Sequence, residues 1–294
     1  MCLSLLLILS ILLSACVASP TSPSDVEAST YIQNKGSDTI VNLALAWAER
    51  YQQEHPNVRI SVTGGGTGTG MAALISGTVD IANASRQIKP EEVDEANKNG
   101  VEPQEYVIAR DAIAVIIHPD NPINKLTLEQ VSRIYRGEIN NWKELGSYDR
   151  PIVRVSRETN SGTHVYFLES VIRLGNDDNK YFFSTDTLLL PSSEGIIAEV
   201  SENPNAIGYD GLGYVTPSVK VVALSEDPAG HYVLPSSETV NNGSYPVSRD
   251  LYMYTGSAPS AAAQAYLQWI MEAEAQEIVI ELGFVPVNGQ AEIR

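Results

Sequence analysis

The sequence predicts an α/β protein with mainly parallel sheets, organised as two domains. From Tyr31 onward, short strand-like apolar runs alternate with amphipathic helical patterns, which is typical of parallel sheets covered by helices. The chain has 294 residues, whereas a single domain ordinarily has roughly 100 to 200. Its composition, 43% hydrophobic and 19% charged, is that of a folded protein and excludes a disordered, collagen-like or coiled-coil chain.

The first residues have the features of an export signal. The apolar run 3–13 is too short for a membrane-spanning helix, which needs ~20 residues, and it fits the hydrophobic region of a secretory signal. Residues 13–16, Leu-Ser-Ala-Cys, resemble the lipobox of bacterial lipoproteins. We therefore predict a lipoprotein signal peptide over residues 1–15 and lipidation of Cys16.

The segment that follows is predicted to be a tether. Residues 16–30 are rich in Ser, Thr, Pro and Ala and contain no aromatic residue before the folded body begins, so they cannot form a packed element. A lipidated Cys16 and this tether would keep the body close to a membrane face. Two points stand against this interpretation: no Lys or Arg precedes the apolar run, and a buried N-terminal helix is an alternative.

The first elements of the body follow from periodicity. Five apolar residues share one face of a predicted helix, and Pro56 ends that helix before an alternating strand over 58–62. The glycine cluster 64–70 then leads into a short helix through Leu74, and apolar residues 79–84 predict the next strand. The five residues of the helix face are Ile40, Leu43, Ala44, Trp47 and Tyr51.

The later elements repeat this alternation. Residues 112–117 are all apolar and predict a buried strand, and Thr-Leu-Glu-Gln at 127–130 is a capping-box start for a helix. A second alternation of strands and helices covers residues 152–222. Residues 251–254 predict a late strand, and the acidic, alanine-rich residues 258–282 predict one or two final helices.

Three segments place a strand end, a small polar turn and a helix start in succession. Each presents hydroxyls and unpaired backbone N–H groups at a helix N-terminus, where the positive end of the helix dipole favours an anion. Glycines let the backbone approach a ligand, and Arg157 can form a bidentate pair with two oxygens. If the three turns converge, they form a cage for an oxyanion. They are residues 36–39, Gly-Ser-Asp-Thr; residues 64–70, Gly-Gly-Gly-Thr-Gly-Thr-Gly; and residues 157–163, Arg-Glu-Thr-Asn-Ser-Gly-Thr.

Each turn taken singly has a simpler explanation, because serine and threonine are ordinary helix N-caps. Residues 68–73 match a loose dinucleotide-binding pattern, but Asp80 follows too soon to be the ribose-binding acid. Ser161 and His164 lie close in sequence without a nucleophile elbow, which argues against a hydrolase. The four histidines lack metal-ligand spacing. No metal, cofactor or catalytic residue is therefore predicted.

Charge and cysteine content narrow the function further. Asp and Glu total 36 against 19 Lys and Arg, and the formal net charge is -17, so a nucleic-acid groove, which needs a basic field, is excluded. The only cysteines are Cys2 and Cys16. The folded body therefore has no disulfide and no cysteine-based metal site. Any anion bound here must be held by local geometry.

In combination, the three turns and the segments between them resemble the phosphate-binding proteins of bacterial ABC transporters. The Arg-x-x-x-Ser-Gly-Thr element at 157–163 is the most specific part of the resemblance, and the ordered series covers essentially the whole mature chain. The other segments of the series are residues 77–86, 118–122, 134–142 and 206–209.

The resemblance implies a set of phosphate ligands. In that family, the arginine, serine, glycine amide and threonine of the Arg-x-x-x-Ser-Gly-Thr element bind phosphate, and the first turn and the glycine-rich turn supply hydroxyls. Carried over to this sequence, one domain would supply Ser37, Asp38, Thr39, Thr67, Ser85 and Arg86, and the other would supply Arg157, Ser161, Gly162 and Thr163.

The sequence departs from one familiar form of that site. There, a carboxylate follows the Ala-Ser dipeptide and accepts the proton of phosphate, whereas here the corresponding residue is Arg86. An arginine cannot accept a proton. Asp38 is the candidate replacement and Glu158 the second candidate, although Asp38 could instead be only an N-cap carboxylate.

The resemblance also implies a type II periplasmic-binding-protein fold, with two α/β domains joined by crossing strands near 111–116 and 249–254 and a ligand cleft between them. Domain I would comprise residues 31–111 plus 254–294, and domain II residues 112–253. The implied function is that of an extracytoplasmic, lipid-anchored monomer, not an enzyme, that closes on inorganic phosphate and delivers it to an ABC permease in the membrane.

Three alternatives remain at this stage. The ligand could be another tetrahedral oxyanion, such as sulfate or molybdate. An enzyme acting on phosphate esters would need a metal cluster or an activated nucleophile, and neither is visible in the sequence. A phosphate-sensing or adhesion lipoprotein without a transport role would have the same sequence features.

Overall fold

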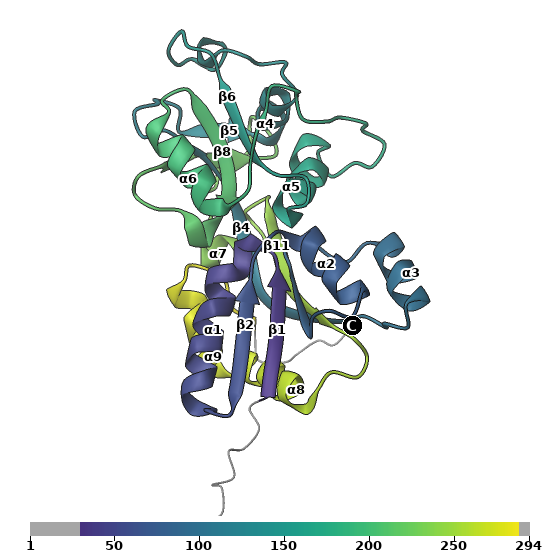
Figure 1. The fold of residues 1–294 in the computed structure, drawn as a ribbon. Helices are drawn as coiled ribbons and strands as arrows, with labels where there is room; N and C mark the ends of the chain where they lie inside the picture. Colours follow the sequence, from purple (N-terminus) through teal and green to yellow (C-terminus); the bar gives the residue numbers. More distant parts are fainter. Residues whose placement is uncertain (1–29, 288–294) are drawn as a thin grey trace, which may run out of the picture.

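The computed structural model describes residues 30–287, which form an α/β fold (Figure 1). Its strands are β1 (Thr30–Gly36), β2 (Val58–Thr63), β3 (Ile81–Ala84), β4 (Gln104–Ile117), β5 (Lys125–Thr127), β6 (Val153–Arg157), β7 (Leu188–Leu190), β8 (Ala206–Gly211), β9 (Lys220–Val221), β10 (Ala223–Ser225) and β11 (Ser248–Thr255).

Helices and single helical turns connect these strands. They are η1 (Asp38–Ile40), α1 (Val41–Glu54), α2 (Thr67–Ile75), α3 (Pro90–Lys98), α4 (Leu128–Tyr135), η2 (Trp142–Leu145), α5 (Gly162–Phe167), η3 (Leu168–Ile172), α6 (Ser193–Glu202), η4 (Leu212–Tyr214), α7 (Ser237–Asn241), α8 (Ala261–Ile270) and α9 (Ala273–Glu281).

The elements group into two lobes, as predicted. The first lobe contains β1 to β3 with α1, α2, α3, α8 and α9, and the second contains β5 to β8 with α4, α5 and α6 (Figure 1). Within each lobe the strands are mainly parallel: β1 pairs parallel with β2 and β3, and β6 pairs parallel with β7 and β8. The carboxyl ends of such strands meet at one sheet edge, where the following turns can gather.

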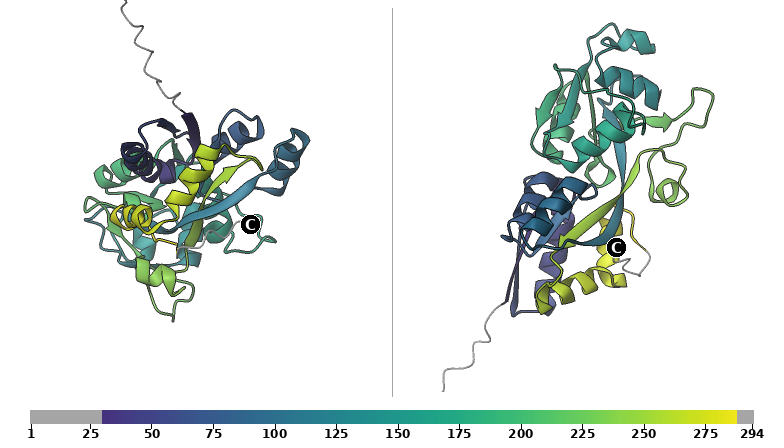
Figure 2. Two further views of the ribbon diagram at one scale, coloured as in Figure 1. Left: turned by 90° about the horizontal axis from the view of Figure 1, so that it is seen from below. Right: turned by 90° about the vertical axis from the view of Figure 1, so that its right-hand side faces the viewer.

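Two long strands, β4 and β11, connect the lobes (Figure 2). Strand β4 pairs antiparallel with β11 from Gln104 to Ala112 and then antiparallel with β8 from Ile113 to Ile117. Strand β11 also pairs with β3, so the order β2-β1-β3-β11-β4-β8-β6-β7 is continuous from one lobe to the other. The predicted pair of crossing strands is confirmed.

Strand β4 is longer than the sequence pattern indicated. The prediction covered residues 112–117, whereas the strand begins at Gln104. Glu105, Arg110 and Asp111 interrupt the apolar pattern of its first half. This half is nevertheless a strand, because its backbone pairs with β11, and the side-chain pattern does not reveal that pairing.

The predicted face of the first helix is buried in the first lobe. Trp47 on α1 is fully buried, and its Nε1 donates to the backbone oxygen of Ala275 at 2.8 Å, which fastens α1 to α9. The capping box is also confirmed: Gln130 N–H donates to Thr127 Oγ1 at 3.1 Å, and Thr127 N–H donates to Gln130 Oε1 at 2.9 Å. The C-terminal pattern resolves into two helices, α8 and α9.

The predicted signal peptide, Cys16 and most of the tether lie outside the described residues. Within residues 30–287, no helix combines the length and apolar character needed to cross a membrane.

Candidate functional site

The first predicted turn lies at the carboxyl end of β1. Gly36 makes this turn possible, because its φ is +147° and a Cβ atom there would lie 2.2 Å from the backbone oxygen of Asn83. The next residues lead into η1, and Ser37 and Thr39 are both buried there. Asp38 Oδ1 accepts a hydrogen bond from the backbone N–H of Gly65 at 2.9 Å. The carboxylate therefore ties the first turn to the second, rather than capping its own helix.

The glycine-rich turn places Thr67 at the first position of α2. Its Oγ1 accepts from the backbone N–H of Ser85 at 3.1 Å and lies 3.2 Å from Ser85 Oγ. Both residues are fully buried. Ser85 directly follows β3, and the glycine-rich turn follows β2. Both strands pair parallel with β1, so their carboxyl ends bring the two hydroxyls to the same edge of the sheet.

The third turn comes from the second lobe and meets the other two. Ser161 is the N-cap of α5, and its Oγ accepts from the backbone N–H of Thr163 at 3.2 Å. Thr163 Oγ1 lies 2.7 Å from Thr39 Oγ1 of the first lobe. Asn160 adds two further bonds, because its backbone oxygen accepts from Gly68 N–H at 2.9 Å and its Nδ2 donates to Gly65 O at 3.0 Å.

Gly162 lies where the two lobes approach each other closely. A Cβ atom at this position would lie 2.4 Å from Thr67 Oγ1 and 2.5 Å from Ser85 Oγ. Any side chain at residue 162 would therefore displace these hydroxyls. The site requires glycine here because of packing across the lobes, since the backbone φ of Gly162 is not in the left-handed region.

Arg157 forms an ion pair across the lobes. It ends β6, its side chain is almost fully buried, and its Nη2 lies 2.8 Å from Asp38 Oδ2. Nη2 also donates to the backbone oxygen of Pro191 at 2.8 Å. The remaining donor, Nε, is buried and has no partner among the described residues. The guanidinium is thus fixed in place, and its Nε–H is not used by any of residues 30–287.

Arg157 is also linked, through Ser193, to the fully buried Asp210. Arg157 Nη1 donates to Ser193 Oγ at 2.9 Å, and Ser193 Oγ donates to Asp210 Oδ1 at 3.0 Å. Asp210 also accepts from the backbone N–H of Gly211 at 2.7 Å. Burial raises the pKa of Asp210 to about 6, although the charge of Arg157 opposes this shift. Ser193 and Asp210 were not predicted from the sequence, because neither belongs to a recognisable turn motif.

Asp210→Asn is expected to change how stability depends on pH. Since its folded-state pKa is about 6 and the ordinary value is 3.8, the folded parent binds a proton more tightly than the unfolded chain does. The parent should therefore lose stability as pH rises from about 4 to about 6, by on the order of 3 kcal/mol, and no more above that range. Urea unfolding at several pH values should show this loss in the parent and not in Asp210→Asn. Parallel curves for the two proteins would contradict it.

The crossing strands contribute a buried ion pair that was not predicted from the sequence. Asp111 on β4 and Arg249 on β11 are both buried, and Asp111 Oδ2 lies 3.1 Å from Arg249 Nη2. Each lies next to another charge in its own strand, Arg110 in β4 and Asp250 in β11, so the sequence does not mark the two as partners. Burial raises the pKa of Asp111, whereas the Arg249 charge lowers it. The two residues were predicted only to lie where the strands cross.

The side chains of Arg86 and Glu158 do not take part in the contacts between the three turns. Both terminal nitrogens of Arg86 are paired with the Glu92 carboxylate, at 2.8 and 2.7 Å. This ion pair engages the donors that the prediction had assigned to an anion, although Nε of Arg86 has no partner among the described residues. Glu158 is exposed, which disfavours it as a proton acceptor in a closed site.

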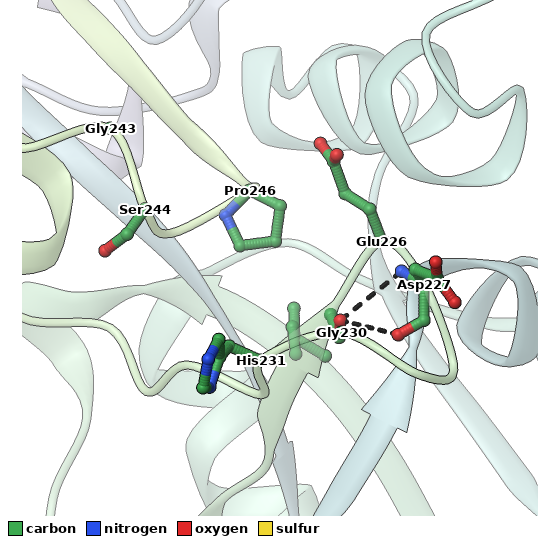
Figure 3. A pocket seen from close by; sticks show the side chains of 9 residues that line it. Glu226, Asp227, Gly230, His231, Gly243, Ser244 and Pro246 are labelled. Carbon is green, nitrogen blue, oxygen red and sulfur yellow. Dashed lines mark hydrogen bonds between the residues drawn. The ribbon is translucent and has the colours of Figure 1, made fainter.

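Figure 3 shows a different pocket, beside β10 and the segment before β11. Its charged acids are Glu226 and Asp227, and no Lys or Arg lines it. The field there repels an anion. Within residues 30–287, no three His, Cys, Asp or Glu side chains are grouped to hold a metal ion.

Two α/β lobes joined by two strands, with an arginine, a carboxylate and several hydroxyls facing one another between them, define a solute-binding protein of the periplasmic-binding-protein class. A family model described as "PBP superfamily domain" matches residues 22–274. The phosphate-binding protein PstS of Pseudomonas aeruginosa is 33% identical to this chain over 273 residues, covering 87% of this chain and 83% of the relative. The chain belongs to the PBP superfamily and, within it, to the PstS family.

Further relatives agree with this assignment. PstS of Bacillus subtilis is 29% identical over 274 residues, covering 92% of this chain and 85% of that protein. The crystal structure of a candidate phosphate ABC transporter substrate-binding protein from Clostridium perfringens, with bound phosphate, is similar at a TM-score of 0.78 and 33% identity. The match covers 88% of this chain and 100% of the Clostridium perfringens chain. An ABC-type phosphate transport receptor from Vibrio cholerae is similar at a TM-score of 0.69 and 27% identity. That match covers 87% of this chain and 100% of the receptor chain.

Proposed function

We propose that this protein binds inorganic phosphate between its lobes and delivers it to an ABC permease. One observation carries the proposal: three turns distant in sequence converge on the cross-lobe pair of the buried Arg157 with Asp38. The named functions of the relatives support phosphate as the ligand. The proposed ligands are Ser37, Asp38, Thr39, Thr67, Ser85, Arg86, Arg157, Ser161, Gly162 and Thr163, with Arg86 the least supported because of its pairing with Glu92.

The site has the donors that a phosphate ion needs. Arg157 offers a planar guanidinium, and the hydroxyls and backbone N–H groups at the starts of α2 and α5 offer further donors. Each charge-assisted hydrogen bond in a closed site contributes ~1.5 to 3 kcal/mol, and the desolvation of phosphate offsets most of the sum. The net charge of -17 opposes binding only weakly, because distant carboxylates are screened beyond ~8 Å at physiological salt.

Asp38 is the proposed acceptor of the phosphate proton. Its Oδ1 and Oδ2 already accept from Gly65 and Arg157, but an ionised carboxylate has about four acceptor positions. Near neutral pH phosphate carries a proton and sulfate does not. A fixed carboxylate therefore accepts a hydrogen bond from phosphate and repels sulfate.

Asp38→Asn is expected to weaken phosphate binding and to allow measurable sulfate binding. The asparagine oxygen can still accept from Gly65 N–H, whereas the amide removes the negative charge that repels sulfate. Titration calorimetry with both anions measures the change. Asp80→Asn is the matched control, since Asp80 Oδ2 also accepts a backbone N–H bond, from Gln33 at 2.8 Å. If sulfate stays excluded in Asp38→Asn, the acceptor lies elsewhere and Glu158 is tested next.

Calorimetric titration of the mature chain with phosphate, sulfate and molybdate at one pH tests the function directly. The expected result is saturable binding of phosphate at a stoichiometry of one and much weaker binding of the other anions. Tighter binding of sulfate or molybdate would replace phosphate with another tetrahedral oxyanion. No binding of any of the three would overturn the proposal.

We also propose how the chain is organised around this function. Domain I would comprise residues 31–111 plus 254–294 and domain II residues 112–253, with closure occurring about β4 and β11. The protein would act as a monomeric binding protein rather than as an enzyme. It would work outside the cytoplasm, attached to the membrane through a signal peptide over residues 1–15, a lipidated Cys16 and a tether over residues 16–30.

Cys16→Ser is expected to release the protein from the membrane fraction of expressing bacteria, because the lipid is attached to that thiol. Cys2→Ser is the matched control and should leave the protein in that fraction, since Cys2 would be removed with the signal peptide. Fractionation followed by immunoblotting measures both. Retention of Cys16→Ser in the membrane would mean that the apolar run 3–13 is an uncleaved anchor.

A further inference from the structure

Arg249 lies on a crossing strand, between the two lobes, rather than in any of the three turns. It is directly opposite Asp111 in the pairing of β11 with β4. Both side chains are withdrawn from solvent, with 3% of the Arg249 side chain and 0% of the Asp111 side chain exposed. A buried arginine without a counter-charge is costly, and the Asp111 carboxylate compensates the charge of Arg249 at this position.

The guanidinium of Arg249 reaches three of the proposed ligand residues. Nη2 donates to Thr163 Oγ1 at 2.9 Å and approaches Thr39 Oγ1 at 3.4 Å. Nη1 donates to the backbone oxygen of Ser85 at 2.8 Å. Thr39 and Ser85 come from the first lobe and Thr163 from the second. One side chain on the crossing strand thus contacts both lobes where they meet.

These contacts determine how the two hydroxyls can use their protons. Arginine can only donate, so Thr163 Oγ1 must accept from Arg249. One hydroxyl proton occupies the 2.7 Å contact between Thr163 Oγ1 and Thr39 Oγ1. The proton of the other hydroxyl is left for an acceptor outside the pair. Donation from a cation also makes a hydroxyl a stronger donor in turn.

We propose that Arg249, held by Asp111, is a positioning residue of the oxyanion site: it directs the hydroxyls of Thr39 and Thr163 toward the anion and links them to the crossing strands. This inference rests on the proposed function. It adds a second fixed arginine, which acts through the hydroxyls whereas Arg157 faces the ligand. Binding of the anion and closure of the lobes are then connected through one side chain.

Phosphate titration of Arg249→Lys tests the proposal. A lysine ammonium keeps the charge but cannot bond to Asp111, Ser85 O and both hydroxyls at once, so the dissociation constant should rise at least fivefold. Arg154→Lys is the matched control: Arg154 is also buried, and it bonds to Asp186, to Asn140 and to backbone oxygens of the second lobe rather than to the turns. Arg154→Lys should change stability without changing the phosphate dissociation constant.

A double-mutant cycle separates positioning from a purely structural role. Thr163→Val removes the hydroxyl while keeping the shape of the side chain. In that background, Arg249→Lys should weaken binding at least threefold less than it does in the parent, because part of its effect passes through the hydroxyl. Additive losses would contradict the proposal, and so would a dissociation constant for folded Arg249→Lys within twofold of the parent.

Asp111→Asn keeps the test decisive if Arg249 variants do not fold. It frees Arg249 from its counter-charge, so phosphate affinity should fall at least threefold, and an unchanged affinity would overturn the inference. Failure of the proposed function gives a different result, because the parent itself would then bind no phosphate. A parent that binds phosphate beside unaffected Arg249 and Asp111 variants would remove only the positioning role.

Discussion

Replacing Gly162 with alanine is expected to weaken phosphate binding about thirtyfold or more, a loss of ~2 kcal/mol. The added methyl group would lie 2.4 Å from Thr67 Oγ1 and 2.5 Å from Ser85 Oγ, far inside normal contact. The two hydroxyls must move or the lobes must separate, and overpacking of this kind costs ~1 to 3 kcal/mol. Titration calorimetry of the purified variant with phosphate measures the loss.

Gly195→Ala is the control for this substitution. Gly195 also lies in the first turn of a helix, α6, but its nearest neighbour to an added Cβ, Ser192 Oγ, would be 3.4 Å away. The variant should bind phosphate like the parent and should be slightly more stable, because alanine favours a helix over glycine. Equal affinities for Gly162→Ala and Gly195→Ala would show that the lobes do not close at residue 162.

Arg157→Lys is expected to weaken phosphate binding at least tenfold, a loss of ~1.4 kcal/mol. The guanidinium bonds at once to Asp38, Pro191 O and Ser193, while its Nε remains available. A single ammonium group cannot reproduce this planar set of donors. The dissociation constant is compared by calorimetry, with thermal unfolding recorded to establish that the variant is folded.

Arg86→Lys provides the comparison within the same site. Both terminal nitrogens of Arg86 are paired with Glu92, so this substitution should weaken phosphate binding less than Arg157→Lys does. The opposite order would make Arg86 the main cationic ligand and would assign Arg157 to holding the lobes together. Near-parent affinity in a folded Arg157→Lys variant would remove Arg157 from the site.

Local sequence patterns predicted most of the elements. The apolar face of α1, the capping box at Thr127 and the run of buried residues in β4 are visible because helix and strand periodicity act over a few residues. The three turns were visible for the same reason, since glycine and hydroxyl residues at helix starts have local functions. The resemblance to phosphate-binding proteins then indicated that the three turns bind one phosphate together.

The sequence did not reveal the contacts made between elements. Arg86 follows β3, Arg157 ends β6, and both resembled anion ligands. Glu92 pairs with Arg86, whereas Asp38 of the opposite lobe pairs with Arg157. The residues that flank Glu92 and Asp38 in the sequence do not indicate these pairings. Likewise, Asp210 acquires a raised pKa only because β8 is buried against its neighbours.

The sequence by itself therefore determined the fold class, the order of elements and the three polar turns of this protein. Only the tertiary structure decided which charges face one another. The Asp111–Arg249 pair joins residues 138 positions apart, and it exists because β4 and β11 run side by side between the lobes. Periodicity reports the environment of each residue along its own element, whereas the partner of a buried charge is set by which strands pair, and that depends on the whole chain.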